Sequence, residues 1–219
     1  MRKMIKFLKE IYRKAKLHMN RVGRKNRNKK LLIKDFTIIS NNCYAGLIYQ
    51  HLDLPYQSPT VGLYFFADEY IKFLKNFNEY IHMDLKFIDV KSSKYYEELC
   101  RLHQENKIIG VLGDVEIVFL HYHSEKETYE KWKKRCARIN YDNIIFKFCD
   151  QNLCTYQHLL EFDNLPYKYK YCFTAKDYKK IKSHIWMKRY KNCDYVLDDA
   201  YFTQKYLNVV EYLNHMEKV

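Results

Sequence analysis

The stretch Phe36-Thr37-Ile38-Ile39-Ser40-Asn41-Asn42-Cys43-Tyr44-Ala45-Gly46-Leu47-Ile48 decides the fold class. Its first five residues are mostly apolar or β-branched and predict a short buried strand. A polar turn follows, and the apolar residues through Leu52 indicate a helix directly after it. In open α/β sheets, ligands bind beyond the carboxyl ends of the strands. We therefore expect an α/β fold with a ligand site near Asn41 and Asn42.

The turn itself has two interpretations. The first amides of a helix favour an anion such as phosphate, so the turn could bind one. Alternatively, Asn41 and Asn42 only cap the helix. Gly46 is the one glycine here, so the turn lacks the GxGxxG pattern of a dinucleotide site.

A second candidate site begins at Phe119-Leu120-His121-Tyr122-His123, which predicts an apolar strand that carries two histidines into a turn. Ser124 and Glu127 have the spacing of a capping box, so we expect a helix to begin directly after His123. Side chains alternate along a strand, which sends the two imidazole rings to opposite faces. At most one of them therefore belongs to a shared site, and a purely structural histidine is the alternative.

Arg135 and Arg138 lie three residues apart on this predicted helix and are neighbours on one side of it. Such a pair can hold a phosphate or carboxylate through two parallel hydrogen bonds. Ion pairing with nearby acidic residues is the alternative on spacing alone.

The remaining apolar runs alternate between strand and helix patterns. We expect a helix from Ala67 to about Ile81, a strand at 85–90, a hairpin around Gly113-Asp114, a strand at 143–149 that ends at Asp150, and a helix at 154–162. An edge strand at 168–173, a capped helix from Thr174, a strand at 191–197 and a helix from Asp199 complete the chain. This order predicts a three-layer α/β/α domain at 35–219 with one mixed, mostly parallel sheet.

The excess positive charge is confined to the first residues. The chain has a net charge of +13, and residues 1–34 contain 14 Lys or Arg and one acid, Glu10. The remainder holds 25 basic and 25 acidic residues and is neutral. This asymmetry indicates a tethering segment, and the neutral body disfavours a nucleic-acid partner.

Residues 3–20 have apolar side chains at helical spacing with lysines and arginines between them. Such a basic amphipathic helix binds anionic lipid surfaces, so we expect residues 1–30 to contact an anionic membrane. Packing of this helix on the domain is the alternative. Residues 21–30 have the composition of a polar linker.

The seven cysteines contain no CxxC pair, which favours a cytoplasmic protein with free thiols and no metal site. No apolar run is long enough to span a bilayer, and residues 1–34 lack the continuous apolar core of a secretory signal. We expect no cofactor, and a location in the cytoplasm or at the inner face of the membrane.

Three motifs together resemble the DUF1919 family, a bacterial group of unknown biochemical function. They are Ser40-Asn41-Asn42-Cys43 with Gly46, the loop from Tyr56 to Leu63, and Phe119-Leu120-His121-Tyr122 followed by the segment from Trp132 to Asn140. The resemblance runs from about residue 35 to the C-terminus and implies an α/β fold. Ala45 departs from the family's pattern, which often has a second glycine there. Members are commonly labelled exopolysaccharide or capsule biosynthesis proteins, and sometimes acetyltransferases.

We therefore expect a glycosyl- or acyltransferase of exopolysaccharide or capsule biosynthesis, acting on a sugar- or phosphate-bearing small molecule. His121 would be the general base, and Cys43 a nucleophile if its thiol lies beside His121. The substrate-binding candidates are Asn41, Asn42, Ser58, Thr60, Tyr122, Arg135, Arg138, Asn140 and Asp150. The alternative is a non-enzymatic, membrane-peripheral protein that binds a glycan or a partner. Convergence of Asn41, Ser58, His121 and Arg135 in one pocket would favour a small-molecule site, and their dispersal over separate faces would favour the non-enzymatic alternative.

Overall fold

The computed structural model describes residues 11–12, 14–15 and 18–216. Its strands form two separate four-stranded sheets. The first sheet has the order β1 (Thr37–Ser40), β6 (Ile144–Cys149), β7 (Lys170–Thr174), β8 (His184–Trp186), and the second has the order β2 (Leu63–Tyr64), β5 (Val115–Phe119), β4 (Ile108–Leu112), β3 (Lys86–Ile88). All pairs in the first sheet are parallel and all pairs in the second are antiparallel. We call them the parallel sheet and the antiparallel sheet.

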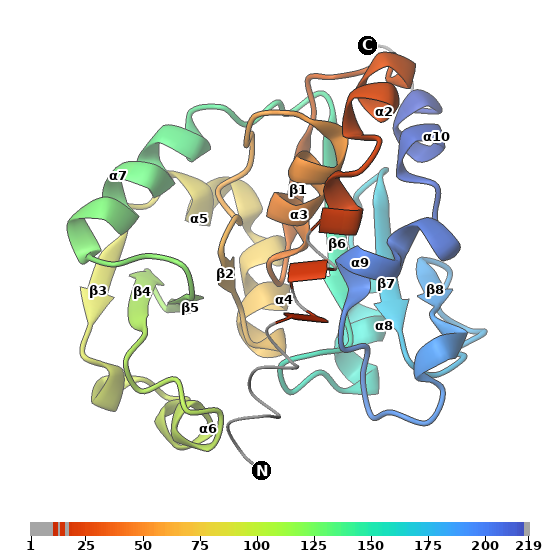
Figure 1. Cartoon of the computed structure of the whole chain (residues 1–219). Coiled ribbons are helices and arrows are strands. Elements are labelled where there is room, and N and C mark those ends of the chain that lie inside the picture. Colours follow the sequence, from red (N-terminus) through yellow and green to blue (C-terminus); the bar gives the residue numbers. More distant parts are fainter. Residues whose placement is uncertain (1–10, 13, 16–17, 217–219) are drawn as a thin grey trace.

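Helices cover both faces of the parallel sheet (Figure 1). The α-helices are α2 (Arg24–Lys30), α3 (Tyr44–Leu52), α4 (Ala67–Lys75), α5 (Phe77–His82), α6 (Tyr96–Arg101), α7 (Glu125–Cys136), α8 (Tyr156–Asn164), α9 (Asp199–Phe202) and α10 (Val209–Asn214). Short 3₁₀ turns lie at Val90–Ser92, Lys188–Tyr190 and Thr203–Lys205. The predicted α/β class is confirmed.

Alternation along the central strands divides the hydrophobic core in two. Ile38 and Ile145 face α3, α9 and α10, whereas Ile39 and Phe146 face α4 and α8. Because neighbouring residues of a strand point to opposite faces, β1, β6 and β7 each contribute side chains to both halves of the core. The parallel sheet is therefore the middle of three layers.

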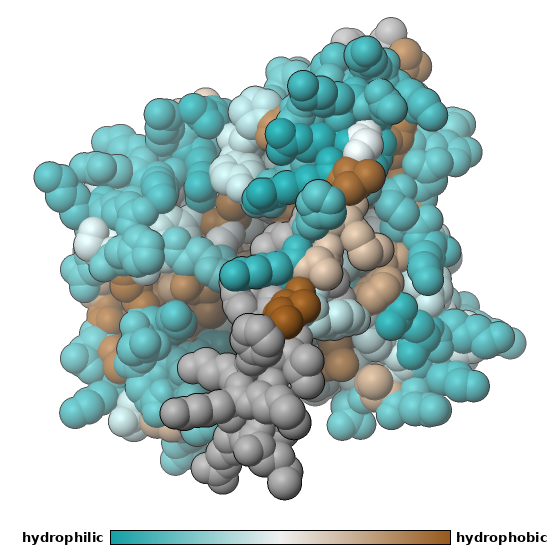
Figure 2. Space-filling view, in the orientation of Figure 1, coloured by the Kyte–Doolittle hydropathy of each residue, from teal (hydrophilic) through white to brown (hydrophobic). Residues whose placement is uncertain are grey.

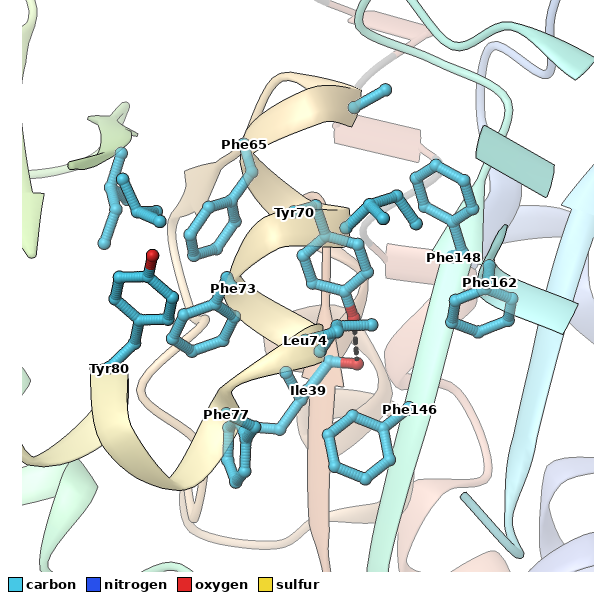
Figure 3. Close-up of a cluster of buried hydrophobic side chains, with 14 of the residues drawn as sticks. Ile39, Phe65, Tyr70, Phe73, Leu74, Phe77, Tyr80, Phe146, Phe148 and Phe162 are labelled. Carbon is cyan, nitrogen blue, oxygen red and sulfur yellow. Dashed lines mark hydrogen bonds between the residues drawn. The ribbon is translucent and has the colours of Figure 1, made fainter. Parts of the chain in front are cut away.

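Helix α4 lies between the two sheets and joins them (Figure 3). Tyr70, on this helix, is fully buried, and its hydroxyl lies 2.9 Å from the carbonyl oxygens of both Ile39 and Lys147. Its ring stacks on Phe148 with the centroids 5.5 Å apart. A buried tyrosine hydroxyl requires such polar partners. These contacts hold α4 against β1 and β6.

The predicted hairpin is present, with β4 and β5 paired around Gly113-Asp114. However, the antiparallel strands do not extend the parallel sheet. Strand β2 contains two residues and pairs with β5, and the chain after it returns to β1, where the Phe65 amide donates to the Asn41 carbonyl oxygen at 3.0 Å. This contact ties the two sheets together without a continuous ladder.

Three predicted elements are wrong. Strand β7 is not an edge strand, because β8 pairs with it on the side away from β6. Residues 174–183 are not helical: the Asp163 carboxylate accepts from the amides of Lys182 and Ser183, and the chain enters β8. Residues 191–197 form no strand.

The basic N-terminal segment is anchored from Asn20 onward. Residues 24–30 form helix α2, so they are not the predicted linker. Asn20 Nδ2 donates to the Leu47 carbonyl oxygen at 3.0 Å, and Arg27 Nε donates to that of His51 at 2.8 Å. Burial and the charge of Arg27 lower the pKa of His51 to about 4, so this imidazole is neutral at pH 7. Most of the predicted 3–20 helix lies outside the described residues.

Candidate functional site

The loops after β1 and β6 meet at the carboxyl edge of the parallel sheet. Asn41 Nδ2 donates to the Cys149 carbonyl oxygen at 3.0 Å, and Asn42 Nδ2 donates to Gln151 Oε1 at 2.9 Å. Parallel pairing of β1 with β6 brings these loops to the same edge. The predicted ligand-binding edge therefore has polar side chains from two distant parts of the chain.

A cavity of about 480 Å³ opens beside this edge. Its lining carries basic side chains and no acidic one, so we call it the cationic cavity. The lining residues are Cys43, Gly46, Leu47, Gln50, Tyr56, Val61, Gly62, His121, Tyr122, Lys131, Arg135 and Tyr201. His121, Tyr122, Arg135 and Cys43 were predicted from the sequence, and the structure brings these four together. Of the four residues whose convergence was the test, His121 and Arg135 line this cavity, and Asn41 and Ser58 do not.

Arg135 forms one wall of the cationic cavity. Its Nη1 donates to the Tyr122 hydroxyl at 2.5 Å and to the Val61 carbonyl oxygen at 3.1 Å. The guanidinium also lies 5.4 Å from the centre of the Tyr56 ring. Within the described residues no carboxylate pairs with it, and Nε and Nη2 make no hydrogen bond to protein. Arg135 is therefore a fixed cation with the N–H donors of two nitrogens, Nε and Nη2, available to a ligand.

His121 lies at the mouth of the same cavity and is exposed. Its amide and that of Leu120 donate to the Gly62 carbonyl oxygen, at 3.1 and 3.0 Å. Gly62 has a φ of 78°, and a Cβ there would lie 3.4 Å from His121 Cβ. The positive φ is the reason for glycine at this end of the 56–62 loop, which lies beside His121. His123 does not line the cavity, which agrees with the prediction that at most one histidine belongs to the site.

Cys43 precedes α3 and lines the cationic cavity, and its thiol lies 3.7 Å from the Leu63 carbonyl oxygen. Burial, and to a lesser extent the charge of Asp199, raises the pKa of Cys43 to about 12. The thiol is therefore protonated at neutral pH. Because the thiolate is the nucleophilic form, these surroundings oppose the predicted nucleophilic role.

The first amides of α3 are already occupied. The Tyr44 amide donates to Asn42 Oδ1 at 3.2 Å, and the Ala45 amide donates to Ser40 Oγ at 3.3 Å. For Asn42, the capping role is the interpretation that the geometry supports. Asn41 does not cap the helix, since its Nδ2 donates to the Cys149 carbonyl oxygen and its Oδ1 accepts no hydrogen bond from the described residues. An anion in the cationic cavity would be bound by side-chain cations instead.

Below the turn, Lys147 forms a buried ion pair with Asp199, which the sequence reading missed. The Lys147 side chain is fully buried, its Nζ donates to Asp199 Oδ2 and to Asn42 Oδ1, and it lies 4.8 Å from the centre of the Tyr44 ring. Asn42 Nδ2 donates to the same Asp199 oxygen at 2.9 Å. The available signal was a lysine inside the otherwise apolar strand Ile144-Ile145-Phe146-Lys147-Phe148-Cys149.

Several other predicted substrate-binding residues have structural roles. Ser58 and Thr60 are fully buried, and Thr60 Oγ1 accepts from the Ser40 amide at 3.0 Å. Asn41 is also fully buried. Asn140 Oδ1 accepts from the Asp142 and Asn143 amides and shapes the turn before β6. None of these four lines the cationic cavity, because each side chain is used in folding the loops beneath it.

Arg138 and Asp150 lie apart from Arg135. Helix α7 ends at Cys136, so Arg138 follows the helix, and its Nη1 donates to the Tyr56 carbonyl oxygen at 3.1 Å. The two arginines therefore do not form the predicted clamp. Asp150 accepts from the Ala175 and Val196 amides at 2.6 and 2.8 Å and borders a different cavity. Burial raises its pKa to about 6.

The predicted N-cap of α7 is confirmed, since the Ser124 side chain accepts from the Glu127 amide. The reciprocal bond of a capping box is displaced by one residue, because Glu127 Oε2 accepts from the His123 amide at 2.9 Å. Among the described residues, no group of three or more His, Cys, Asp or Glu side chains is arranged to hold a metal ion.

Comparison with known proteins agrees with the motifs at this edge. The model of a family described as "Domain of unknown function (DUF1919)" matches residues 13–219. The chain belongs to the DUF1919 family. The match begins within the basic N-terminal segment, so DUF1919 extends further toward the N-terminus than the three motifs indicate. A Haemophilus influenzae protein described as uncharacterized is 33% identical over 189 residues, which cover 84% of this chain and 85% of that protein.

Proposed function

We propose that the cationic cavity binds a phosphate-bearing sugar and that the protein is a transferase of exopolysaccharide or capsule biosynthesis. The observation that carries this proposal is Arg135, a cation without a carboxylate partner among the described residues, on the wall of a cavity that His121 also lines. A half-buried guanidinium held in place by protein contacts is well suited to a phosphate or carboxylate.

The aromatic lining suits the sugar part of such a ligand. Tyr56, Tyr122 and Tyr201 all border the cavity. Tyrosine rings offer an apolar face to the C–H groups of a sugar and a hydroxyl to its oxygens. Tyr122 is held by its hydrogen bond to the Val61 carbonyl oxygen at 2.6 Å. A rigid ring costs little entropy when a ligand binds.

The residues support a simple transfer reaction. His121 accepts the proton of an acceptor hydroxyl, whose oxygen bonds to the sugar carbon as the bond from that carbon to the phosphate oxygen breaks. The phosphate leaves with the electron pair of the broken bond. Arg135 stabilises the charge that develops on it. Lys131 also lines the cavity, but its ion pair with Glu127 at 2.5 Å offsets its charge. Cys43 takes no part, because its thiol is protonated.

The basic N-terminal segment supports a location at an anionic membrane surface. Ile11 and Met19 are 48% and 73% exposed, so a large part of each of these apolar side chains is accessible to a lipid surface. Most of the molecular face in Figure 2 is hydrophilic, and its apolar residues form limited patches. Within the described residues no helix is long and apolar enough to cross a bilayer. The proposed contact is therefore peripheral.

A thermal-shift screen of the full chain against nucleotide sugars and acyl donors tests the proposal. A bound ligand raises the melting temperature by mass action. We expect a nucleotide sugar to do so, and Arg135→Gln to abolish the shift. Arg138→Gln is the matched control, because Arg138 is an exposed arginine nearby that does not line the cavity. A shift that survives Arg135→Gln would place the ligand elsewhere.

Turnover of a ligand found in this way separates an enzyme from a binding protein. His121→Ala should lower the transfer rate by about 10²- to 10⁴-fold while leaving the ligand-induced thermal shift. Binding without transfer to any of the acceptors offered would support the alternative, a non-enzymatic glycan-binding protein.

A further inference from the structure

A second cavity, of about 290 Å³, adjoins the cationic cavity. The two share Cys43, Leu47 and Tyr201 as a common wall. The second lining is rich in side-chain amides, so we call it the amide-lined cavity. Its other lining residues are Asn42, Tyr44, Tyr64, Leu102, Gln104, Leu120, Gln151, Asn152, Leu197, Asp198, Asp199 and Ala200.

The charges of the two cavities are segregated. The amide-lined cavity has no Lys, Arg or His in its lining and contains Asp198 and Asp199, whereas the cationic cavity has no acid. Asp199 is neutralised by its ion pair with Lys147. A phosphate would therefore be attracted to one cavity only, and the other suits an uncharged, polar ligand.

Two polar atoms of the amide-lined cavity are available to a ligand. Gln104 Oε1 accepts from the Tyr64 hydroxyl at 2.7 Å, which fixes the amide and leaves Nε2 without a protein partner in the described chain. Asn152 Nδ2 donates to the Phe65 carbonyl oxygen at 3.1 Å, and its Oδ1 likewise has no protein partner there. One oriented donor and one oriented acceptor match a hydroxyl group, which can both accept and donate.

The remaining amides of this cavity are held rigidly. Asn42 is hydrogen-bonded to Lys147, Asp199 and Gln151, and Gln151 Nε2 donates to the carbonyl oxygens of Val196 and Leu197. Leu102 and Leu197, at the rim, are 38% and 55% exposed and offer apolar contact beside these polar groups. Preorganised polar groups among apolar and aromatic surfaces are typical of small-ligand sites.

We infer that the amide-lined cavity is the acceptor site, and that it binds an uncharged sugar through the amides of Gln104 and Asn152. The position of this sugar beside the phosphate site rests on the proposed function, since a transferase needs two adjoining sites. Binding of the sugar itself does not depend on that reaction.

Methyl glycosides of glucose, galactose, mannose and N-acetylglucosamine are the probes for this site, used with the full chain in saturation-transfer NMR titrations. At least one should bind, and Gln104→Ala should weaken its binding roughly fivefold or more, the effect of one lost hydrogen bond. Gln157→Ala is the control, because Gln157 Nε2 donates to Glu161 Oε1 at 3.1 Å and the residue lines neither cavity. It should leave glycoside binding unchanged.

Competition with inorganic phosphate separates this inference from the proposed function. Phosphate should bind to the cationic cavity, lose affinity in Arg135→Gln, and leave glycoside binding intact. Absence of binding by all four glycosides, or glycoside binding that phosphate displaces, would overturn the acceptor site without affecting the phosphate site. If a glycoside binds and phosphate does not, the proposed function is contradicted and the sugar site is still supported. A circular dichroism melt of each variant identifies any that fails to fold.

Discussion

The Lys147 ammonium group donates to the Asp199 carboxylate although the two residues lie 52 positions apart, and their side chains are 0% and 8% exposed. Asn42 bridges them by donating to Asp199 and accepting from Lys147. This buried pair connects β6, α9 and the turn before α3. It thereby holds together the carboxyl edge of the parallel sheet, and its Asn42 and Asp199 line the amide-lined cavity.

Breaking this pair should destabilise the fold strongly. Lys147→Met leaves the Asp199 carboxylate buried without its cation, and we expect a loss of about 3–5 kcal/mol in the free energy of unfolding. The double variant Lys147→Met/Asp199→Leu should recover most of that loss. Urea denaturation measures the free energy of unfolding of both variants. Lys72→Met is the control, because the Lys72–Asp114 pair is exposed and contributes about 0–1 kcal/mol. Equal losses in the single and double variants would show that the pair is not coupled.

Asp150 should make stability depend on pH. Its pKa is raised by burial from the ordinary 3.8 to about 6, so the folded state binds the proton more tightly than the unfolded state. The stabilisation is fully present below pH about 4 and is lost as pH rises through 6, a change of about 3 kcal/mol. Between pH 4 and 7, the free energy of unfolding of the wild type should therefore fall by about that amount relative to that of Asp150→Asn.

Asp114 provides a control of opposite sign. Hydrogen bonds from Tyr80 and Lys72 hold the pKa of this carboxyl below its ordinary value. Its stabilisation is present above the unfolded pKa and is lost as pH falls, so Asp114→Asn should gain on the wild type toward low pH. Parallel pH profiles for the two variants would contradict these assignments.

Gly62→Ala should damage both stability and the cationic cavity. An L-residue at a φ of 78° costs about 1–2 kcal/mol, and the added Cβ would contact His121 and Tyr122, each 3.4 Å away, so relaxation of that backbone strain moves the cavity wall. Gly113→Ala, at a φ of 59° in the hairpin turn, meets the flexible Met83 side chain instead. Both variants should lose stability in urea, but only Gly62→Ala should weaken phosphate binding. If the two variants change phosphate binding equally, the 56–62 loop has no specific role in the cationic cavity.

The Cys43 thiol should react slowly. With a pKa raised to about 12, its thiolate fraction at pH 7.5 is roughly a thousandfold below that of an ordinary cysteine. Mass spectrometry after iodoacetamide treatment should find Cys43 unmodified in the native protein and modified in urea. Rapid alkylation of native Cys43 would restore the thiolate nucleophile as a hypothesis.

The full chain should bind vesicles that contain anionic lipid, and the binding should fall with added salt. Residues 1–18 contain seven Lys or Arg and one acid, and each cation near such a surface contributes about 1 kcal/mol. Deleting residues 1–18 removes them but keeps the Asn20 and Arg27 contacts to α3. Vesicle sedimentation should show loss of binding on this deletion, and no binding to neutral vesicles. Binding that resists salt would contradict a peripheral electrostatic contact.

The local pattern of the sequence determined much of the fold. Apolar β-branched runs predicted β1 and β6, the capping box predicted where α7 begins, and Gly113-Asp114 predicted the hairpin. These features depend on side-chain periodicity and caps within a few residues, which any reading of the sequence can detect. The region from 174 to 197 was misassigned because its backbone amides are bound by distant carboxylates, those of Asp150 and Asp163.

The tertiary structure alone decided which polar residues form a site. Ser58, Thr60 and Asn41 have ligand-like chemistry, yet the packing of loops on β1 buries them. Arg135 and His121 reach one cavity only because β2 pairs with β5 and brings the 56–62 loop beneath them. The Lys147–Asp199 pair likewise needs β6 and α9 side by side. Contacts between residues far apart in sequence depend on how the sheets and helices pack, and a local sequence pattern carries no record of that packing.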